Sequence, residues 1–137
     1  MAKKIPLQPE NFELETNTVW AFPNRGKWAT HDAKYRGNWS PYIPRNVILR
    51  YSNERETVLD QFVGSGTTAV ESKLTGRNFI GVDINPNAVE ITKNKLNFNC
   101  DSEVDKMISE FSFLEDAVIL NGDKTVFCTH GHVYNKD

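Results

Sequence analysis

The residues best suited to chemistry lie in one stretch, VLDQFVGSGTTAVESKLTGRNFIGVDIN, which covers residues 58–85. Two glycines, a serine and two threonines follow an apolar run that contains Asp60, and a second apolar run ends on Asp83. Glycines let the backbone turn sharply and let a ligand approach closely, and the N–H groups that open the next helix suit a carboxylate. A carboxylate at the end of the second run can accept both hydroxyls of a ribose. The pattern therefore predicts a site for a nucleoside-containing cofactor.

The residues of this turn also indicate which class of nucleoside-containing cofactor fits best. A P-loop for nucleoside triphosphates needs a lysine in the turn, which is absent, and a nicotinamide fingerprint needs a third glycine where Ala69 stands. Asp60 at the mouth of the turn would repel a pyrophosphate and attract an ammonium group. S-adenosylmethionine carries an ammonium and a sulfonium, so it is the favoured cofactor. A glycine-rich elbow that binds nothing is the alternative interpretation.

The elements that must position these residues follow from apolar runs, helical periodicity and capping residues. Four apolar runs predict strands, at 57–62, 78–84, 116–123 and 125–130. Four segments predict helices, at 42–52, 66–76, 85–98 and 102–115. Ser40 and Asn85, each followed by a proline, are the predicted caps of the first and third helices. Because strands alternate with helices, we expect an α/β fold with a partial parallel sheet flanked by helices.

Length, charge and hydropathy bound the organisation and the partners. At 137 residues the chain suits one domain, predicted over 20–137 behind an N-terminal lead-in at 1–19. Residues 1–50 hold eight Lys/Arg against four Asp/Glu, which favours an anionic partner for that half. No apolar run is long enough to cross a membrane and no secretory signal is evident, so we expect a cytoplasmic protein without a membrane partner.

Two other clusters allow more than one interpretation. Cys128, His130 and His132 could bind a metal, but three close neighbours rarely form a site alone, so we expect none. All three tryptophans lie within 20–39 with basic residues between them, an arrangement that can hold DNA phosphates and unstacked bases. Alternatively, the rings pack over the cofactor and the sheet while the charges face water. For Trp39 we favour packing, and for Arg25 and Lys27 both interpretations stay open.

The motif-bearing region resembles that of the DNA methyltransferases that methylate adenine N6 or cytosine N4. The family pattern Asp-x-Phe-x-Gly-Ser-Gly-Thr-Thr, then Gly-Arg, then Gly-Ile/Val-Asp/Glu, is matched within residues 58–96, and the upstream YRGNWSPYIPRNVILRYS is similar to the segment that precedes it in the family. The resemblance implies a Rossmann-like, S-adenosylmethionine-dependent methyltransferase fold. It also implies S-adenosylmethionine as the cofactor and DNA as a partner, in the setting of restriction-modification.

The resemblance further implies which residues hold the methionine end of the cofactor. Asp60 would hold the ammonium group, and the turn from Phe62 to Gly66 would wrap around the cofactor. Thr67 and Thr68 would offer hydroxyls and helix N–H groups to the carboxylate. The upstream segment from Asn38 to Pro41 would line this end.

At the nucleoside end, the resemblance assigns the ribose to Asp83, one face of the adenine to Ile84, and the adenine amine to Asp123. The full predicted cofactor-binding set is Asn38, Trp39, Ser40, Pro41, Asp60, Phe62, Gly64, Ser65, Gly66, Thr67, Thr68, Asp83, Ile84 and Asp123.

The catalytic segment of that family is not evident in this sequence. The family uses Asp/Asn/Ser-Pro-Pro-Tyr/Phe/Trp, whose polar side chain accepts from the target amine while the ring stacks on the flipped base. The sequence contains no Pro-Pro pair, and THGHVY at 129–134 keeps Thr129, His130 and the aromatic Tyr134 but lacks the prolines and is one residue longer. The catalytic residues are therefore unknown, no target-recognition region is evident, and the chain by itself is predicted to bind the cofactor without methylating DNA.

Three explanations of this incomplete pattern stay open. The chain could be one half of a split enzyme that a second polypeptide or a second copy completes. It could be a truncated or degenerate methyltransferase. It could be a non-catalytic module that binds S-adenosylmethionine and acts through a partner. Methylation of RNA or protein would use the same turn, because a fold does not determine the substrate.

Overall fold

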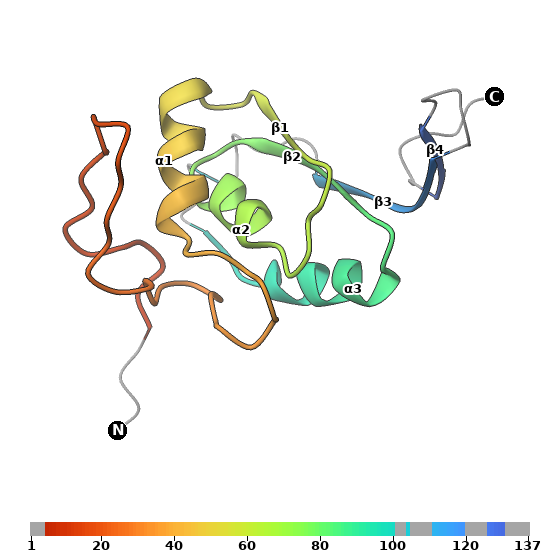
Figure 1. Ribbon diagram of the computed structural model, residues 1–137, viewed down its shortest axis with the longest axis horizontal. Helices are drawn as coiled ribbons and strands as arrows, with labels where there is room; N and C mark the ends of the chain where they lie inside the picture. The colour runs from red at the N-terminus through yellow and green to blue at the C-terminus, as the bar shows by residue number, and fades with distance from the viewer. Residues whose placement is uncertain (1–4, 101–103, 105–110, 120–125, 131–137) are drawn as a thin grey trace.

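The computed structural model describes residues 5–100, 104, 111–119 and 126–130. The elements in chain order are α1 (Tyr42–Tyr51), β1 (Thr57–Asp60), α2 (Thr67–Leu74), β2 (Asn78–Asp83), α3 (Pro86–Lys95), β3 (Phe111–Ile119) and β4 (Val126–His130). In Figure 1 the N-terminal segment lies beside α1, and β4 lies at the opposite end of the molecule. No helix in the described part of the chain has the length and hydropathy to span a bilayer.

The four strands form one sheet in the order β1-β2-β3-β4. β1, β2 and β3 are parallel, while β4 runs antiparallel to β3. α2 and α3 both pack on β2, and α1 packs on α2. The predicted α/β fold with a partial parallel sheet flanked by helices is therefore confirmed. Because Asp60 is paired with Gly81, the carboxyl ends of β1 and β2 lie at the same edge of the sheet.

The predicted boundary between the last helix and the third strand is wrong. Residues 111–115, predicted to end a helix, form the first half of β3, so this strand begins five residues before the predicted 116. Phe111 pairs with Phe79 on β2, and the Phe113 ring lies 5.9 Å from the Phe79 ring, so cross-strand packing overrides the local helical pattern. Of the region 102–110 the structure describes Val104 alone, which is helical.

The start of α3 is confirmed and the start of α1 is corrected. Asn85 Oδ1 accepts a hydrogen bond from Asn87 N at 3.0 Å, and Pro86 is the first residue of α3. α1 instead begins after Pro41, without a side-chain cap. The predicted cap, Ser40, accepts a long hydrogen bond from Tyr42 N at 3.4 Å on its Oγ and donates the same hydroxyl to the Arg25 carbonyl at 2.8 Å, so it connects the start of the helix to the preceding loop.

Two clusters of buried side chains form the core, and both include residues of α2. One contains Trp28, Val70 and Leu74, and the other contains Val63, Ala69 and Phe79. A fully buried side chain of this size contributes about 1.5–3 kcal/mol to stability. Because α2 belongs to both clusters, the helix that follows the glycine-rich turn is held rigidly behind that turn.

A buried polar network joins the N-terminal half of the chain to α2. Glu71 is fully buried; its Oε1 accepts from Trp28 Nε1 at 2.7 Å and lies 2.7 Å from His31 Nε2. Its Oε2 accepts from Arg45 at 2.8 Å, and Arg45 donates in turn to Gln8 Oε1 at 2.6 Å. The Glu71 carboxylate therefore joins the loop around residue 30 and α1 directly, and the segment around residue 8 through Arg45.

Candidate cofactor-binding site

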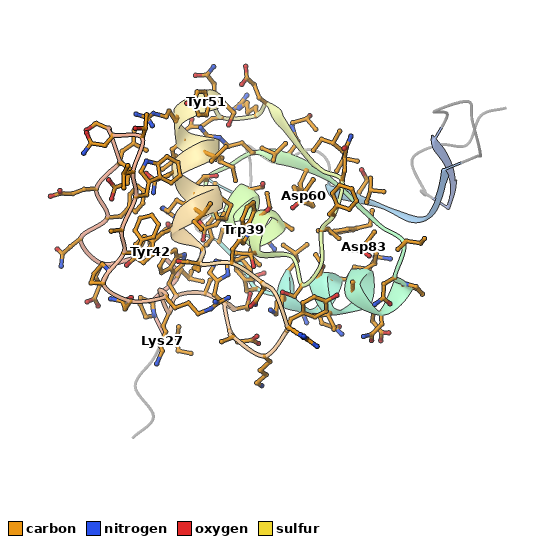
Figure 2. The ribbon with its side chains drawn as sticks, in the orientation of Figure 1. Lys27, Trp39, Tyr42, Tyr51, Asp60 and Asp83 are labelled. Carbon is orange, nitrogen blue, oxygen red and sulfur yellow. The ribbon has the colours of Figure 1, made fainter. Side chains whose placement is uncertain are left out.

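A pocket of about 420 Å³ opens beside the end of β1 and the glycine-rich turn, a size within the range of small-molecule sites. Its lining residues are Tyr35, Arg36, Gly37, Asn38, Trp39, Asp60, Phe62, Val63, Gly64, Ser65 and Thr67. Half of the predicted cofactor-binding set is therefore brought together: Asn38, Trp39, Asp60, Phe62, Gly64, Ser65 and Thr67. Figure 2 shows Asp60 and Trp39 in the same part of the molecule, near Asp83.

The remaining predicted residues lie around the pocket without lining it. These are Ser40, Pro41, Gly66, Thr68, Asp83 and Ile84. Asp123, together with His132, lies outside the described residues. For Cys128 and His130 the structure describes the strand but not the side chains, so the prediction that Cys128, His130 and His132 bind no metal is not tested.

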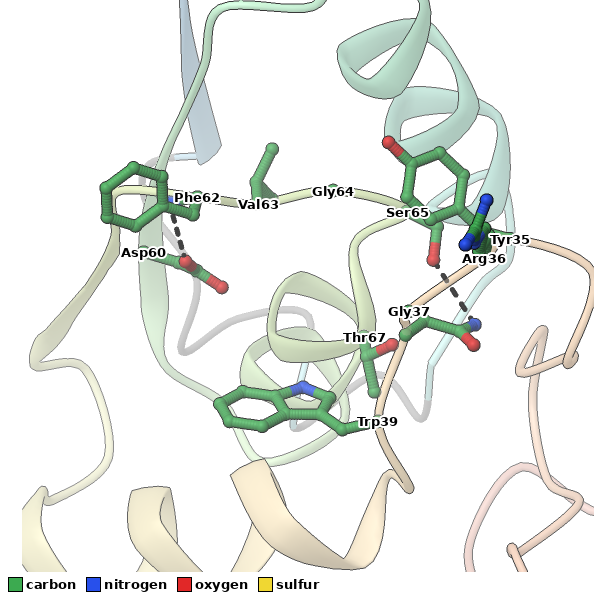
Figure 3. A pocket seen from close by; sticks show the side chains of 11 residues that line it. Tyr35, Arg36, Gly37, Trp39, Asp60, Phe62, Val63, Gly64, Ser65 and Thr67 are labelled. Carbon is green, nitrogen blue, oxygen red and sulfur yellow. Dashed lines mark hydrogen bonds between the residues drawn. The ribbon is translucent and has the colours of Figure 1, made fainter.

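Asp60 is held so that its carboxylate faces the pocket. Its Oδ1 accepts a hydrogen bond from Phe62 N at 3.0 Å, which closes a tight turn directly after β1. Figure 3 shows Asp60 and Phe62 on one side of the pocket, with Tyr35 and Arg36 across from them and the Trp39 indole below. The Phe62 side chain is 86% exposed. An exposed ring beside a carboxylate suits a ligand that carries both apolar and cationic groups.

Asp83 supports the turn from the neighbouring strand. Its Oδ2 accepts from Gly64 N at 2.8 Å, and its Oδ1 accepts from Asn85 N at 2.9 Å. The carboxylate thus ties the glycine-rich turn to the end of β2. Each carboxylate oxygen can accept a second hydrogen bond, so these contacts leave acceptor capacity for a ligand hydroxyl. Ile84 follows with its side chain 77% exposed at the same edge.

The two glycines of the turn serve different purposes. Gly64 lines the pocket, and its carbonyl accepts from Thr92 Oγ1 at 3.0 Å. Gly66 has a φ of +80°, and a Cβ there would lie 2.5 Å from Thr92 Cγ2. The space that Gly66 leaves is therefore occupied by α3, whereas we expected it to admit a ligand. At Gly66 the glycine is required for packing and for the left-handed backbone.

Hydroxyl groups gather where α2 begins. Ser65 and Thr67 are buried and line the pocket, next to the first N–H groups of the helix. Thr68 is also buried, and its Oγ1 has no hydrogen-bond partner among the residues that the structure describes. Buried hydroxyls next to a helix N-terminus provide donors for an anionic group.

The opposite wall is the loop that leads into α1, and Asn38 is its best connected residue. Asn38 Oδ1 accepts from Arg25 at 2.6 Å, and Asn38 Nδ2 donates to the Asp32 carbonyl at 2.9 Å. Nδ2 also lies 3.4 Å from Ser65 Oγ, a contact drawn as a dashed line in Figure 3. The amide therefore connects the loop to the glycine-rich turn across the pocket. Trp39 beside it is 48% exposed.

The same loop is anchored to the C-terminal end of α3. Thr30 Oγ1 donates to the Lys95 carbonyl at 2.6 Å, and Lys95 Nζ lies 3.3 Å from Asp32 Oδ1. Burial opposes ionisation of Asp32, but the hydrogen bond from the Lys34 N–H and the nearby Lys95 ammonium outweigh it. Together they hold the pKa of Asp32 below its ordinary value of 3.8.

Sequence analysis missed four residues of the lining, namely Tyr35, Arg36, Gly37 and Val63. Three of them directly precede the predicted Asn38, and the fourth lies within the predicted turn. Their position next to predicted residues was the available signal, since their residue types do not identify a ligand.

Comparison with known proteins identifies a family. The model of a family described as DNA methylase matches residues 2–94. The type II methyltransferase M2.LlaDCHI of Lactococcus lactis subsp. cremoris is 42% identical over 71 residues, covering 52% of this chain and 25% of that protein. The DNA adenine methyltransferase YhdJ of Escherichia coli (strain K12) is 33% identical over 95 residues, covering 69% and 32%. The type II methyltransferase M1.MboII of Moraxella bovis is 46% identical over 63 residues, covering 41% and 24%.

The family match covers most of this chain, whereas the chain spans only a small part of each relative. The matched region amounts to 25%, 32% and 24% of the lengths of these three methyltransferases. The family match at 2–94 contains every lining residue of the pocket.

Proposed function

The chain belongs to the N6/N4 DNA methylase family, and we propose that it is the S-adenosylmethionine-binding portion of a methyltransferase acting on adenine N6 or cytosine N4 in DNA. One observation carries the proposal: a carboxylate, buried hydroxyls and exposed aromatic rings converge on one pocket at the carboxyl end of β1. The carboxyl ends of parallel strands are where α/β proteins bind their ligands. The family uses S-adenosylmethionine as its methyl donor, which matches these groups.

The methionine end of the cofactor fits the groups that line the pocket. Asp60 attracts the ammonium group, because opposite charges at contact distance favour each other most where water is partly excluded. Ser65 and Thr67 offer hydroxyls to the carboxylate beside the N-terminus of α2. Trp39 and Phe62 provide exposed apolar surface for the carbon atoms next to the sulfur.

The nucleoside end is assigned to the end of β2. Asp83 would accept the ribose hydroxyls with the lone pairs that Gly64 N and Asn85 N leave free. Ile84, with a 77% exposed side chain, would pack on the adenine face. Asp123 would accept from the adenine amine. The exposure of Ile84 at this edge supports the assignment, because large apolar side chains exposed at a site favour a bound apolar group.

The chemistry expected of these residues is binding and alignment. S-adenosylmethionine supplies a methyl group that its sulfonium already activates. Asp60, the turn and α2 hold the amino-acid end, and this fixes the direction in which the methyl group faces. The acceptor for the amine hydrogens and the ring that stacks on a flipped base are not evident in this sequence. We therefore propose that residues outside this sequence supply them, as in an enzyme that a second polypeptide completes.

A non-catalytic S-adenosylmethionine-binding module is the second candidate function. The observation in its favour is that the 137 residues contain no Pro-Pro pair, which the catalytic segment of the family requires. Such a module would bind the same cofactor in the same pocket and act through a partner.

Two measurements test the proposal. Isothermal titration of the purified chain with S-adenosylmethionine is expected to show one site per chain, and the absence of heat at millimolar ligand would contradict it. Incubation of the chain with DNA and tritiated cofactor is expected to leave the DNA unlabelled. Labelled DNA with this chain as the only protein would show that the catalytic groups are present after all, and would exclude the non-catalytic module.

A further inference from the structure

We propose that Arg25 is a positioning residue of the pocket, which holds Asn38 and Trp39 in place and thereby sets the affinity for the amino-acid end of S-adenosylmethionine. The inference rests on the proposed function, since it concerns the same pocket. Arg25 does not line the pocket and acts through the two residues that do. The sequence singled out Arg25 only as one of the basic residues between the tryptophans, with its role left open.

Three hydrogen bonds from one nitrogen of Arg25 carry the inference. Its NH2 group donates to the Asn38 carbonyl at 3.0 Å, to Asn38 Oδ1 at 2.6 Å and to the Trp39 carbonyl at 2.8 Å. The guanidinium thus binds the backbone carbonyls of Asn38 and Trp39 and the side-chain oxygen of Asn38. Hydrogen bonds from a charged donor are stronger than those between neutral groups.

The same loop also hydrogen-bonds to the backbone of Arg25, so both the backbone and the side chain of Arg25 are fixed. Ser40 Oγ donates to the Arg25 carbonyl at 2.8 Å. Residues 38–40 therefore bond to residue 25 from both directions. Ser40, a residue predicted to line the pocket, acts instead on the outer side of this wall.

Asn38 links this loop to the glycine-rich turn on the other side of the pocket. With its Oδ1 bound to Arg25, the amide is oriented so that Nδ2 faces the Asp32 carbonyl at 2.9 Å and Ser65 Oγ at 3.4 Å. Loss of Arg25 would remove the contact that determines which way this amide points. The loop and the start of α2 would then lose their direct link beside the predicted carboxylate site.

Arg25 borders a second cavity of about 660 Å³, which also touches Gly26, Trp28 and Tyr42, whereas residues 38–40 line no part of it. The guanidinium bonds to the Asn38 and Trp39 carbonyls therefore tie the loop at the pocket to the segment beside this second cavity. For Arg25, sequence analysis left open whether the side chain binds DNA or faces water. In the structure its NH2 group instead bonds to Asn38 and Trp39, which line the pocket.

The test compares Arg25→Met, Arg25→Lys and Lys27→Met in the same chain. Met keeps much of the length of Arg25 and removes its donors. Lys restores charged donors on a single nitrogen, with three N–H hydrogens where the Arg25 NH2 group shares two among its three acceptors. Lys27 is exposed and has no hydrogen-bond partner among the described residues, so Lys27→Met removes the same charge two residues away.

Each variant is titrated with S-adenosylmethionine and with 5′-methylthioadenosine, which lacks the amino-acid end. We expect Arg25→Met to weaken S-adenosylmethionine binding by about tenfold, Arg25→Lys by less, and Lys27→Met not at all. Binding of 5′-methylthioadenosine should be unchanged in all three. This split separates positioning of the methionine end from a general loss of structure, which would weaken both ligands.

Hydrogen exchange of the ligand-free protein completes the test. The Asn38 and Ile43 amides donate to the Tyr35 and Ser40 carbonyls at 3.3 and 3.0 Å, and both should exchange faster in Arg25→Met than in Lys27→Met. Unchanged exchange, equal losses for both ligands, or wild-type affinity in Arg25→Met would each overturn the inference. If the wild-type chain binds no S-adenosylmethionine, the proposed function fails, and hydrogen exchange alone then decides whether Arg25 fixes the wall.

Discussion

Replacement of Glu71 by glutamine should destabilise the chain severely. Glu71 is fully buried, and both of its oxygens accept hydrogen bonds, Oε1 from Trp28 Nε1 at 2.7 Å and Oε2 from Arg45 at 2.8 Å. His31 Nε2 lies 2.7 Å from Oε1 as well. An amide keeps the shape but offers only one acceptor oxygen, so a donor would face either the Trp28 and His31 side or the Arg45 side.

The magnitude follows from the burial of the partners. Arg45 is 9% exposed, so Glu71→Gln leaves a buried guanidinium without its carboxylate. Breaking one partner of a buried ion pair costs about 3–5 kcal/mol. For 137 residues, an unfolding entropy of about 2.1 cal/mol/K per residue converts this loss into a fall in Tm of about 10–17 °C.

Thermal unfolding followed by circular dichroism measures this effect, with Glu90→Gln as the matched control. Glu90 lies exposed on α3, and the same substitution there should change stability by no more than about 0.5 kcal/mol. If Glu71→Gln melts within about 3 °C of Glu90→Gln, the carboxylate contributes too little to be the anchor of the N-terminal half, and the reasoning is refuted.

Three further predictions concern the pocket and its support. Asp60→Asn should weaken S-adenosylmethionine binding about five- to thirtyfold in calorimetry, because the partly buried carboxylate is worth about 1–2 kcal/mol to an ammonium. It should leave 5′-methylthioadenosine binding unchanged, and equal losses for both ligands would contradict the assigned role. Gly66→Ala should lower the urea midpoint, since its Cβ would meet Thr92 Cγ2 at 2.5 Å on a backbone with φ of +80°, and an unchanged midpoint would refute this packing. The lowered pKa of Asp32 means that its pairing stabilises the fold above its ordinary value of 3.8 and that this contribution is lost as the pH falls through the folded-state pKa. Asp32→Asn should therefore be less stable than the parent at pH 7, and the difference should shrink as the pH falls below 3.8, as measured by urea unfolding; a constant difference would contradict the assignment.

Local patterns predicted most of the elements around the pocket. The β-branched run before Asp60 identified β1, and Asn85 followed by proline identified the start of α3. The glycine, serine and threonine pattern predicted a turn into a helix, and its resemblance to the DNA methyltransferases agrees with the family match over 2–94. These signals succeed because turn chemistry, capping and strand propensity depend on residues a few positions apart.

Long-range partners were beyond the reach of such patterns. Glu71 reads in the sequence as one polar residue of a short helix, yet its partners Arg45, His31 and Trp28 lie 26, 40 and 43 positions away. The same limit explains the early start of β3, where Phe113 packs on Phe79 of the neighbouring strand.

The sequence by itself determined the kind of site: an acidic residue before a glycine-rich turn, hydroxyls at the start of a helix, and a second acidic residue after the next strand. The tertiary structure decided which of these groups share a cavity, bringing Asp60 to the pocket and committing Asp83 to the backbone of the turn. It also decided that Arg25 holds the opposite wall and that the space at Gly66 belongs to Thr92. The physical reason is that a side chain's partners depend on how distant segments pack against one another, whereas its local backbone conformation depends on its neighbours in the chain.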